Sequence, residues 1–92
     1  MAHSLSSKKR IRQNVTRRAL NRSRRGSLKS TLRRCNDLLL HGSTADTERS
    51  VRDAIKLLDR EASRGLIHRN AAARRKSRLA QRLQTMQQKA EA

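Results

Sequence analysis

The first 36 residues of the chain contain twelve Lys and Arg residues and no Asp or Glu. Such a segment repels itself, and its charge is tolerable when a polyanion neutralises it. The remaining charge is uneven, because residues 37–65 have a net charge of −1 and residues 66–92 have a net charge of +6. We therefore expect both ends of the chain to face a polyanion and the middle to be an ordinary solvated surface.

A net charge of +17 on 92 residues makes nucleic acid the leading candidate partner, because it offers a dense row of phosphates. An anionic membrane surface is the second candidate. The chain has no Phe, Trp or Tyr, which excludes base stacking on aromatic platforms and argues against RNA-recognition sheets and oligonucleotide-binding barrels. No apolar run approaches the ~18 residues needed to span a bilayer.

The N-terminus is rich in Arg and Ser and lacks acid, which is also typical of an organellar transit peptide. The basic pattern continues past residue 30 and returns near the C-terminus, where a transit peptide would not place it. Residues 1–30 contain no apolar stretch typical of a secretory signal. Cys35 is the only cysteine, so no intrachain disulfide forms, as is usual in a reducing, cytosolic compartment.

Catalytic and metal chemistry find little support in the sequence. The histidines His3, His41 and His68 are dispersed, with no second ligand at zinc spacing. Cys35 falls on an apolar stripe, which predicts a buried, inert thiol rather than a nucleophile. We find no catalytic triad, carboxylate pair or Gly-rich phosphate loop. The sequence predicts no enzyme activity, no cofactor and no small-molecule substrate.

Helical periodicity predicts three helices, over about residues 7–41, 44–64 and 67–88. The chain contains no Pro, so nothing forces a break in a long helix, and no segment alternates as a strand would. Gly42 and Gly65 stand where helix C-terminal glycines belong. Ser43, with an acid three residues on, is a helix-start pattern.

Apolar side chains recur along each predicted helix at intervals of three and four residues. The three stripes are Leu28, Leu32, Cys35 and Leu39; Val51, Ile55, Leu58 and Ala62; and Ala72, Leu79, Leu83 and Met86. Two i, i+4 ion pairs are expected on the second helix, Glu48–Arg52 and Arg49–Asp53. Short connections between the helices favour an antiparallel, all-α three-helix bundle.

The first helix is longer than the others, and its apolar stripe is dense only from Leu28 onward. We therefore expect its basic N-terminal half to project beyond the bundle. The chain is predicted to be a single domain over residues 1–92, with residues 1–25 as a basic extension embedded in RNA and residues 26–92 as the bundle. Residues 1–25 are expected to be disordered or partly helical in the free protein and helical once phosphates neutralise them.

Arginine and lysine side chains suit phosphate, and Asn and Ser can bond phosphate oxygens or 2′-hydroxyls. Arg74, Arg78 and Arg82 lie at i, i+4 and i+8, which predicts one ridge able to follow a phosphate backbone. His68 is expected to contact a phosphate or base, or else to form a helix-start hydrogen bond. The candidate RNA-binding residues are Lys8, Lys9, Arg10, Arg12, Arg17, Arg18, Asn21, Arg22, Ser23, Arg24, Arg25, Lys29, His68, Arg69, Asn70, Arg74, Arg75, Lys76, Arg78 and Arg82.

Several stretches of the chain resemble a known family. They are Ser-Lys-Lys-Arg at 7–10, Arg-Arg at 17–18, Asn-Arg-Ser-Arg-Arg at 21–25 and, most specifically, Gly-Leu-Ile-His-Arg-Asn at 65–70 followed by an Ala-rich basic helix. In order and length this resembles the bacterial small-subunit ribosomal protein that carries number twenty in the usual naming. Residues 36–64 match in pattern rather than identity, and the first six residues depart from the common opening.

The resemblance implies a three-helix bundle whose long first helix lies in ribosomal RNA. It implies direct, early binding of 16S ribosomal RNA in 30S assembly, with contacts to the 5′ domain and to the long helix near the RNA's 3′ end. It also implies a cytoplasmic monomer within the ribosome, beside other small-subunit components and away from membranes. The family's basic positions correspond to Lys8, Lys9, Arg10, Arg17, Arg18, Arg24, Arg25, Arg74, Arg75 and Lys76.

A DNA-binding architectural protein is the nearest alternative, since electrostatics alone do not choose RNA over DNA. Such a protein would usually have a dimer seam or a compact helix-turn-helix, and the longest apolar stripe here is too short for a zipper. A membrane-active peptide would need a bulky apolar face, and residues 8–25 offer only Ile11, Val15, Ala19 and Leu20.

Overall fold

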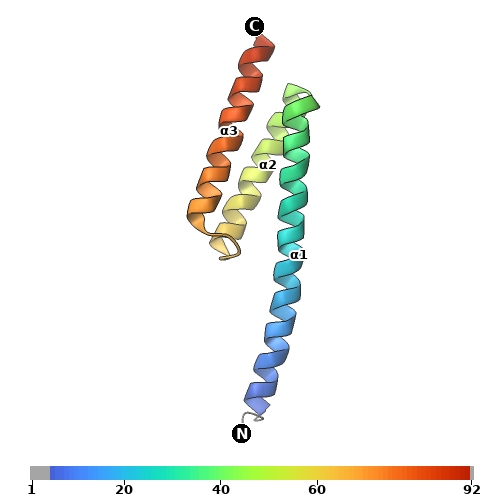
Figure 1. Ribbon diagram of the computed structural model, residues 1–92, viewed down its shortest axis with the longest axis vertical. Helices are drawn as coiled ribbons and strands as arrows, with labels where there is room; N and C mark the ends of the chain where they lie inside the picture. Colours follow the sequence, from blue (N-terminus) through green and yellow to red (C-terminus); the bar gives the residue numbers. More distant parts are fainter. Residues whose placement is uncertain (1–4, 92) are drawn as a thin grey trace.

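The computed structural model describes residues 5–91, and within that range the chain forms three helices and no strand. The helices are α1 (Leu5–His41), α2 (Thr44–Ser63) and α3 (Arg69–Glu91). The chain reverses direction at each connection, and α2 packs against both α1 and α3 (Figure 1). The predicted all-α three-helix arrangement is confirmed. The third helix, predicted to end near residue 88, continues to Glu91, because residues 88–90 are good helix formers.

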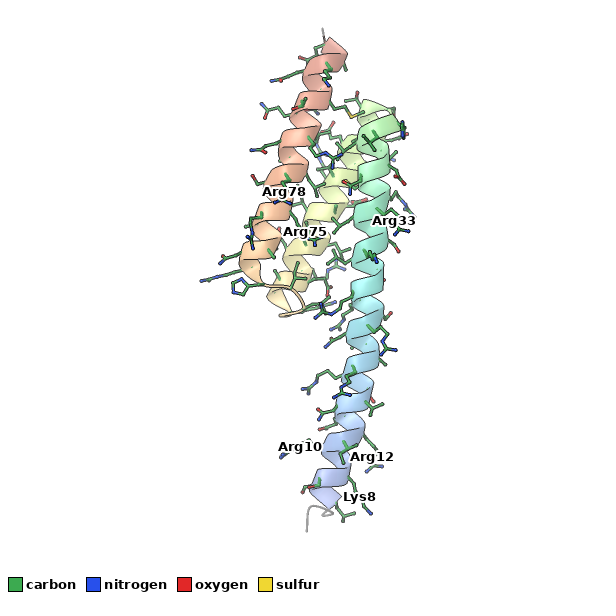
Figure 2. All side chains as sticks on the ribbon, in the orientation of Figure 1. Lys8, Arg10, Arg12, Arg33, Arg75 and Arg78 are labelled. Atoms are coloured by element: carbon green, nitrogen blue, oxygen red, sulfur yellow. The ribbon has the colours of Figure 1, made fainter. Side chains whose placement is uncertain are left out.

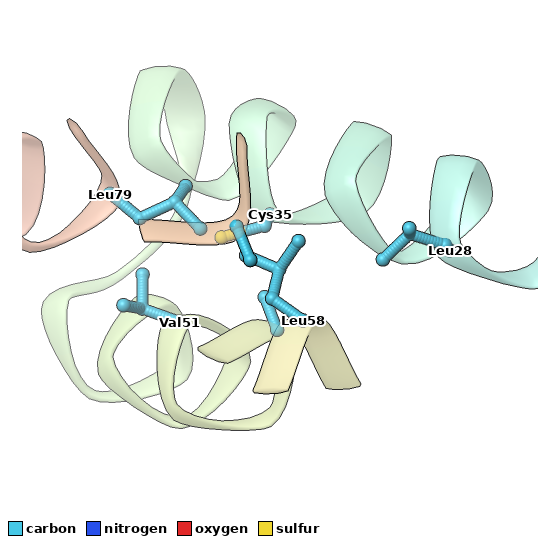
Figure 3. Close-up of a cluster of buried hydrophobic side chains, with 7 residues drawn as sticks. Leu28, Cys35, Val51, Leu58 and Leu79 are labelled. Carbon is cyan, nitrogen blue, oxygen red and sulfur yellow. The ribbon is translucent and has the colours of Figure 1, made fainter. Parts of the chain in front are cut away.

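The core is a single cluster of small and aliphatic side chains between the three helices (Figure 3). Its buried members are Leu28, Cys35, Val51, Ala54, Leu58, Ala72 and Leu79. Leu58 and Cys35 have no exposed surface. The apolar stripes predicted on α1 and α3 therefore point into the core, with Leu32, Leu39 and Leu83 partly buried against it and Met86 half-buried farther along α3.

The buried face of α2 differs from the predicted stripe. Thr47, Val51, Ala54, Leu58 and Glu61 are buried at intervals of four and three residues, whereas Ile55 and Ala62 are only partly buried. The face is rotated because α2 lies between two helices, so positions toward both partners are covered. Two polar residues, Thr47 and Glu61, are thus buried at positions outside the predicted stripe.

The connection between α1 and α2 is tight, and it is fixed by hydrogen bonds. The Ser43 side chain accepts a hydrogen bond from the Asp46 backbone N–H at 3.2 Å, as the helix-start pattern predicts. The Thr47 hydroxyl lies 2.6 Å from the Ser43 carbonyl oxygen and 3.0 Å from the Leu38 carbonyl oxygen. A Cβ at Gly42 would lie 2.9 Å from the same Leu38 oxygen. Any side chain at residue 42 would clash with Leu38, so this tight connection requires glycine.

The end of α2 is a glycine-terminated cap. Gly65 has a φ of +81°, a backbone conformation that L side chains rarely adopt. Its N–H donates to the Ala62 carbonyl at 3.1 Å, and the Leu66 N–H donates to the Glu61 carbonyl at 2.9 Å. Leu66 then folds back and is 8% exposed. Both features confirm the predicted closure of this helix at Gly65.

Two surface ion pairs were expected on α2, and one of them forms. Arg52 pairs with Glu48 at 2.7 Å. Within residues 5–91, Arg49 and Asp53 form no ion pair, so that prediction is wrong. Both side chains are exposed, and a base placed N-terminal to an acid is the weaker order on a helix.

The long first helix projects beyond the other two (Figure 1). α1 has 37 residues, or about 55 Å at 1.5 Å per residue, and its first buried residue is Leu28. The described chain measures 70 Å in its longest dimension and has a radius of gyration of 18.4 Å, against about 12 Å for a compact domain of this length. The protein is thus a small bundle with a helical arm.

Candidate nucleic-acid interface

The arm, residues 5–25 of α1, presents cations in every direction. Arg10 lies on one side of the helix and Lys8 and Arg12 on the other (Figure 2). No residue of the arm is buried, and apart from Ser7, Asn21 and Arg24, which are half-buried, all are exposed. Because successive residues turn by about 100°, the predicted arm contacts cannot all meet one flat surface. The arm suits a partner that surrounds it.

Apolar side chains on the arm are exposed as well. Ile11 is 61% exposed and Val15 is 62% exposed, and they are four residues apart on one side of the helix. The Thr16 hydroxyl donates to the Arg12 carbonyl at 3.0 Å, which leaves its oxygen lone pairs available as acceptors. In water the helical conformation of the arm gains little stability from packing, because no other helix covers it. Its conformation therefore depends on the partner that neutralises its charge.

The basic surface of α3 is arranged differently from the predicted ridge. Arg75, Arg78 and Arg82 line the seam between α3 and α1, whereas Arg74 is exposed outside that seam. Figure 2 shows Arg75 and Arg78 on the side of α3 that faces α1. At about 100° per residue these three guanidinium groups fall within one narrow sector. Arg78 and Arg82 belong to the predicted ridge as well, so the packing of α3 beside α1 adds Arg75 to two members of that ridge.

Two of the predicted contact residues also bind within the protein. Lys76 pairs with Asp59 of α2, with 2.6 Å between Nζ and Oδ1. Arg82 donates from Nη1 to the Asn36 side-chain oxygen of α1 at 2.7 Å. These contacts hold α3 against its two neighbours. They leave Lys76 less available to a phosphate than the other cations of α3.

His68 forms the helix-start hydrogen bond that was one of its two expected roles. Its Nδ1 accepts from the Asn70 backbone N–H at 3.1 Å, and its carbonyl accepts from the Ala72 N–H at 3.0 Å. Nδ1 carries no proton in this arrangement, and the neutral ring then has its proton on Nε2, which remains a donor. The neighbouring Arg69 is exposed. A phosphate or base contact by His68 stays a prediction.

Two arginines of α1, Arg33 and Arg34, were not among the predicted contact residues. Both are exposed, and Arg33 lines the same seam as Lys29 and Arg75. The acid-free run of 36 residues includes both arginines, so the charge signal was present. What the sequence did not show was that α3 would lie beside this part of α1.

The acidic residues are concentrated on α2, which holds five of the seven. Asp37 of α1 and Glu91 of α3 are the others. The basic surfaces therefore belong to the outer helices, and the central helix is nearly balanced. This agrees with the expectation that the middle of the chain is an ordinary solvated surface.

The single cysteine is structural. Cys35 has no exposed surface, and burial raises the pKa of its thiol above the ordinary value, although a hydrogen bond with Ser50 and the charge of Arg82 oppose the rise. A raised pKa reduces the thiolate fraction and so the nucleophilicity. The predicted burial of this thiol is confirmed, and its raised pKa agrees with the prediction that it is inert.

Neither a metal cluster nor a membrane helix is found in the described part of the chain. Within residues 5–91, no three His, Cys, Asp or Glu side chains are grouped so that they could hold a metal ion. No helix in that range is long and apolar enough to cross a bilayer. His3, which was considered as a ligand, lies outside the described residues.

Comparison with known proteins identifies the family. The family model for ribosomal protein S20 matches residues 2–84. The chain belongs to this family. Proteins called small ribosomal subunit protein bS20 are similar over most of the chain. The relative from Alkalilimnicola ehrlichii is 42% identical over 95% of this chain and 99% of its own length. That from Thermobifida fusca is 41% identical over 96% of each chain.

The family assignment confirms the resemblance seen in residues 65–70 and the basic runs of α1. A third relative, from Rhodopirellula baltica, is 44% identical over 86% of this chain and 88% of its own length. The named relatives are proteins of the small ribosomal subunit, and their family is not known to be enzymatic. The function to be explained is therefore what the exposed cations of the arm and of α3 bind.

Proposed function

We propose that this protein is a structural constituent of the small ribosomal subunit that binds 16S ribosomal RNA directly. The observation that supports this most strongly is the arm of α1, which carries nine cations and no acid over residues 8–25. A helix with cations on all sides and little packing of its own is suited to a site enclosed by phosphates. Residues 1–25 are then the RNA-embedded extension, and residues 26–92 are the bundle that anchors it.

The separation of the two basic surfaces supports a bridging role. The arm extends from one end of the bundle, and the arginines of α3 lie beside the core, in a protein 70 Å long. Two RNA segments held by one rigid body are kept at a fixed distance, and their mutual repulsion is reduced by the cations between them. We propose that the segments are the 5′ domain and the long helix near the 3′ end, joined early in 30S assembly.

The setting that follows from this role is the cytoplasmic ribosome. The protein would act there as a monomer beside other small-subunit components, without a membrane contact. The named relatives are bacterial proteins, in keeping with a bacterial rather than an organellar ribosome. The names of the relatives support the assignment to the small subunit, and the charged surfaces described above support the proposed contact with RNA.

A salt titration of binding to small-subunit ribosomal RNA, with duplex DNA of equal length as competitor, tests the proposal. We expect tight RNA binding at physiological salt and poor competition by DNA. A generic polycation would lose both ligands equally as salt rises, with a slope of about −0.7 to −0.9 per phosphate contacted. That result would favour the alternative of a generic nucleic-acid-binding architectural protein, and the assembly role would be withdrawn.

A further inference from the structure

Two adjoining hollows lie along the seam between α1 and α3. One has a volume of about 520 Å³ and the other of about 320 Å³, and both are lined by Leu32, Asn36 and Arg75. They form one continuous depression, which we call the α1–α3 groove. It exists because both helices pack mainly against α2 and have few contacts with each other.

The groove combines a basic rim with an apolar floor. Its lining contains one acid, Asp37. Six cations contribute to its walls: Arg25, Lys29 and Arg33 from α1, and Arg75, Arg78 and Arg82 from α3. Four aliphatic residues lie beneath them: Leu28, Leu32, Ile67 and Leu79. Leu28 and Leu79 are buried in the core, and Leu32 and Ile67 are half-buried against it.

This chemistry differs from that of the arm. The arm is convex and offers charge in every direction, whereas the groove is concave, with aliphatic carbon between its two rows of cations. Phosphates and ribose hydroxyls gain nothing from an aliphatic surface, but the flat face of a base does. A paired base in an RNA duplex is stacked on both faces, so only an unpaired base can present its face to such a floor.

The polar and charged side chains of the rim can contact the phosphates and the edge of the base. A guanidinium group binds phosphate as a planar fork and can also stack on a base. Cations on both walls can therefore hold the phosphates on either side of an extruded base. Asn36, in both hollows, offers an amide for the base edge, although its oxygen already accepts from Arg82.

We propose that the α1–α3 groove binds one unpaired, extruded nucleotide of RNA, with its base on the Leu32–Ile67 floor and its flanking phosphates on the arginines of both walls. This rests on the proposed function, that the protein binds ribosomal RNA, and it adds the structural feature of the RNA that is selected. A phosphate backbone lying across the rim without a base in the groove is the competing outcome.

The test is base-specific chemical probing of small-subunit ribosomal RNA with the full-length protein. We expect an unpaired nucleotide to be protected in the complex. Arg75→Gln should restore its reactivity and weaken RNA binding about tenfold. Arg60→Gln is the matched control, because Arg60 is also exposed but lines a separate hollow between α1 and α2. It should leave the nucleotide protected.

A second pair of variants changes the groove charge in the opposite direction. Asp37→Asn removes the one acid of the groove and should tighten RNA binding about threefold, while Asp53→Asn, in the hollow that contains Arg60, should tighten it less. The side chains changed in the four variants, at residues 37, 53, 60 and 75, are exposed, so each variant should keep the fold.

The groove proposal is overturned if Arg75→Gln and Arg60→Gln weaken RNA binding equally and no base loses its protection in Arg75→Gln. That result leaves the proposed function intact. Equal RNA and DNA binding by the unaltered protein would overturn the proposed function as well.

Discussion

Gly26 lies inside α1, two residues before the first buried residue of that helix. A Cβ added there meets nothing within 4 Å, so Gly26→Ala introduces no clash. Alanine should stabilise the helix by about 0.5–1 kcal/mol, because glycine loses more backbone entropy on folding. For a domain of this size that gain corresponds to a rise in Tm of about 3–6 °C. Thermal unfolding followed by circular dichroism at 222 nm measures it.

Gly65→Ala is the control with the opposite sign. Gly65 also has open space around it but has a φ of +81°, where an L residue costs about 1–2 kcal/mol. The same change of one methyl group should therefore lower Tm at residue 65 and raise it at residue 26. An unchanged or lowered Tm for Gly26→Ala would mean that residue 26 is not helical within the cooperative unit. The folded part of α1 would then begin nearer Leu28, and α1 would not be one continuous helix in the folded protein.

Three further results are expected. The pKa of the Cys35 thiol is raised by burial, so the folded state retains this proton at a pH where the unfolded state loses it. The stability that Cys35 contributes is then full below the ordinary pKa of a thiol and is lost as pH rises toward the raised pKa of the folded state. Urea unfolding at pH 8 and pH 10 should show a larger loss in the native protein than in Cys35→Ala, and equal losses would contradict this. Lys76→Gln should weaken RNA binding less than Arg74→Gln, because Lys76 already pairs with Asp59; filter binding measures both, and the reverse order would refute it. Residues 5–25 are helical in the structure but have no buried side chain, so we expect this part of α1 to unfold partly in the free protein and the full chain to gain helical ellipticity at 222 nm when RNA is added; an unchanged spectrum would contradict the prediction that residues 1–25 are disordered or partly helical without RNA.

Much of the fold could be predicted because the helices are marked by simple signals. The repeats of leucine on α1 and α3, the capping pattern at Ser43 and the glycine at position 65 all correspond to local physical requirements. The breaks between helices are set by backbone chemistry within a few residues, so they are visible in the chain. Projection of the arm was also predictable, because its apolar stripe is too thin to be covered.

The details that escaped prediction depend on which helices become neighbours. Lys76 belongs to the same basic run as Arg75, and only the packing of α3 on α2 sends one toward Asp59 and the other toward α1. Arg33 is likewise distinguished from other arginines only by the helix opposite it. The net charge predicts a polyanionic partner, whereas three-dimensional packing decides which cations share one site.

Glu61 shows most clearly how packing can override residue type, because periodicity would not place a carboxylate in the core. Its side chain is 2% exposed, Oε1 accepts from the half-exposed Arg64 at 3.1 Å, and Oε2 has no partner. Glu61→Met keeps the length and removes the unpaired oxygen, so urea unfolding should show about 1 kcal/mol of added stability. Glu48→Met, at a carboxylate that is 39% exposed and paired with Arg52, should change stability by less than about 0.5 kcal/mol. A clear loss at Glu61 beside a neutral result at Glu48 would mean that the buried carboxylate stabilises the bundle.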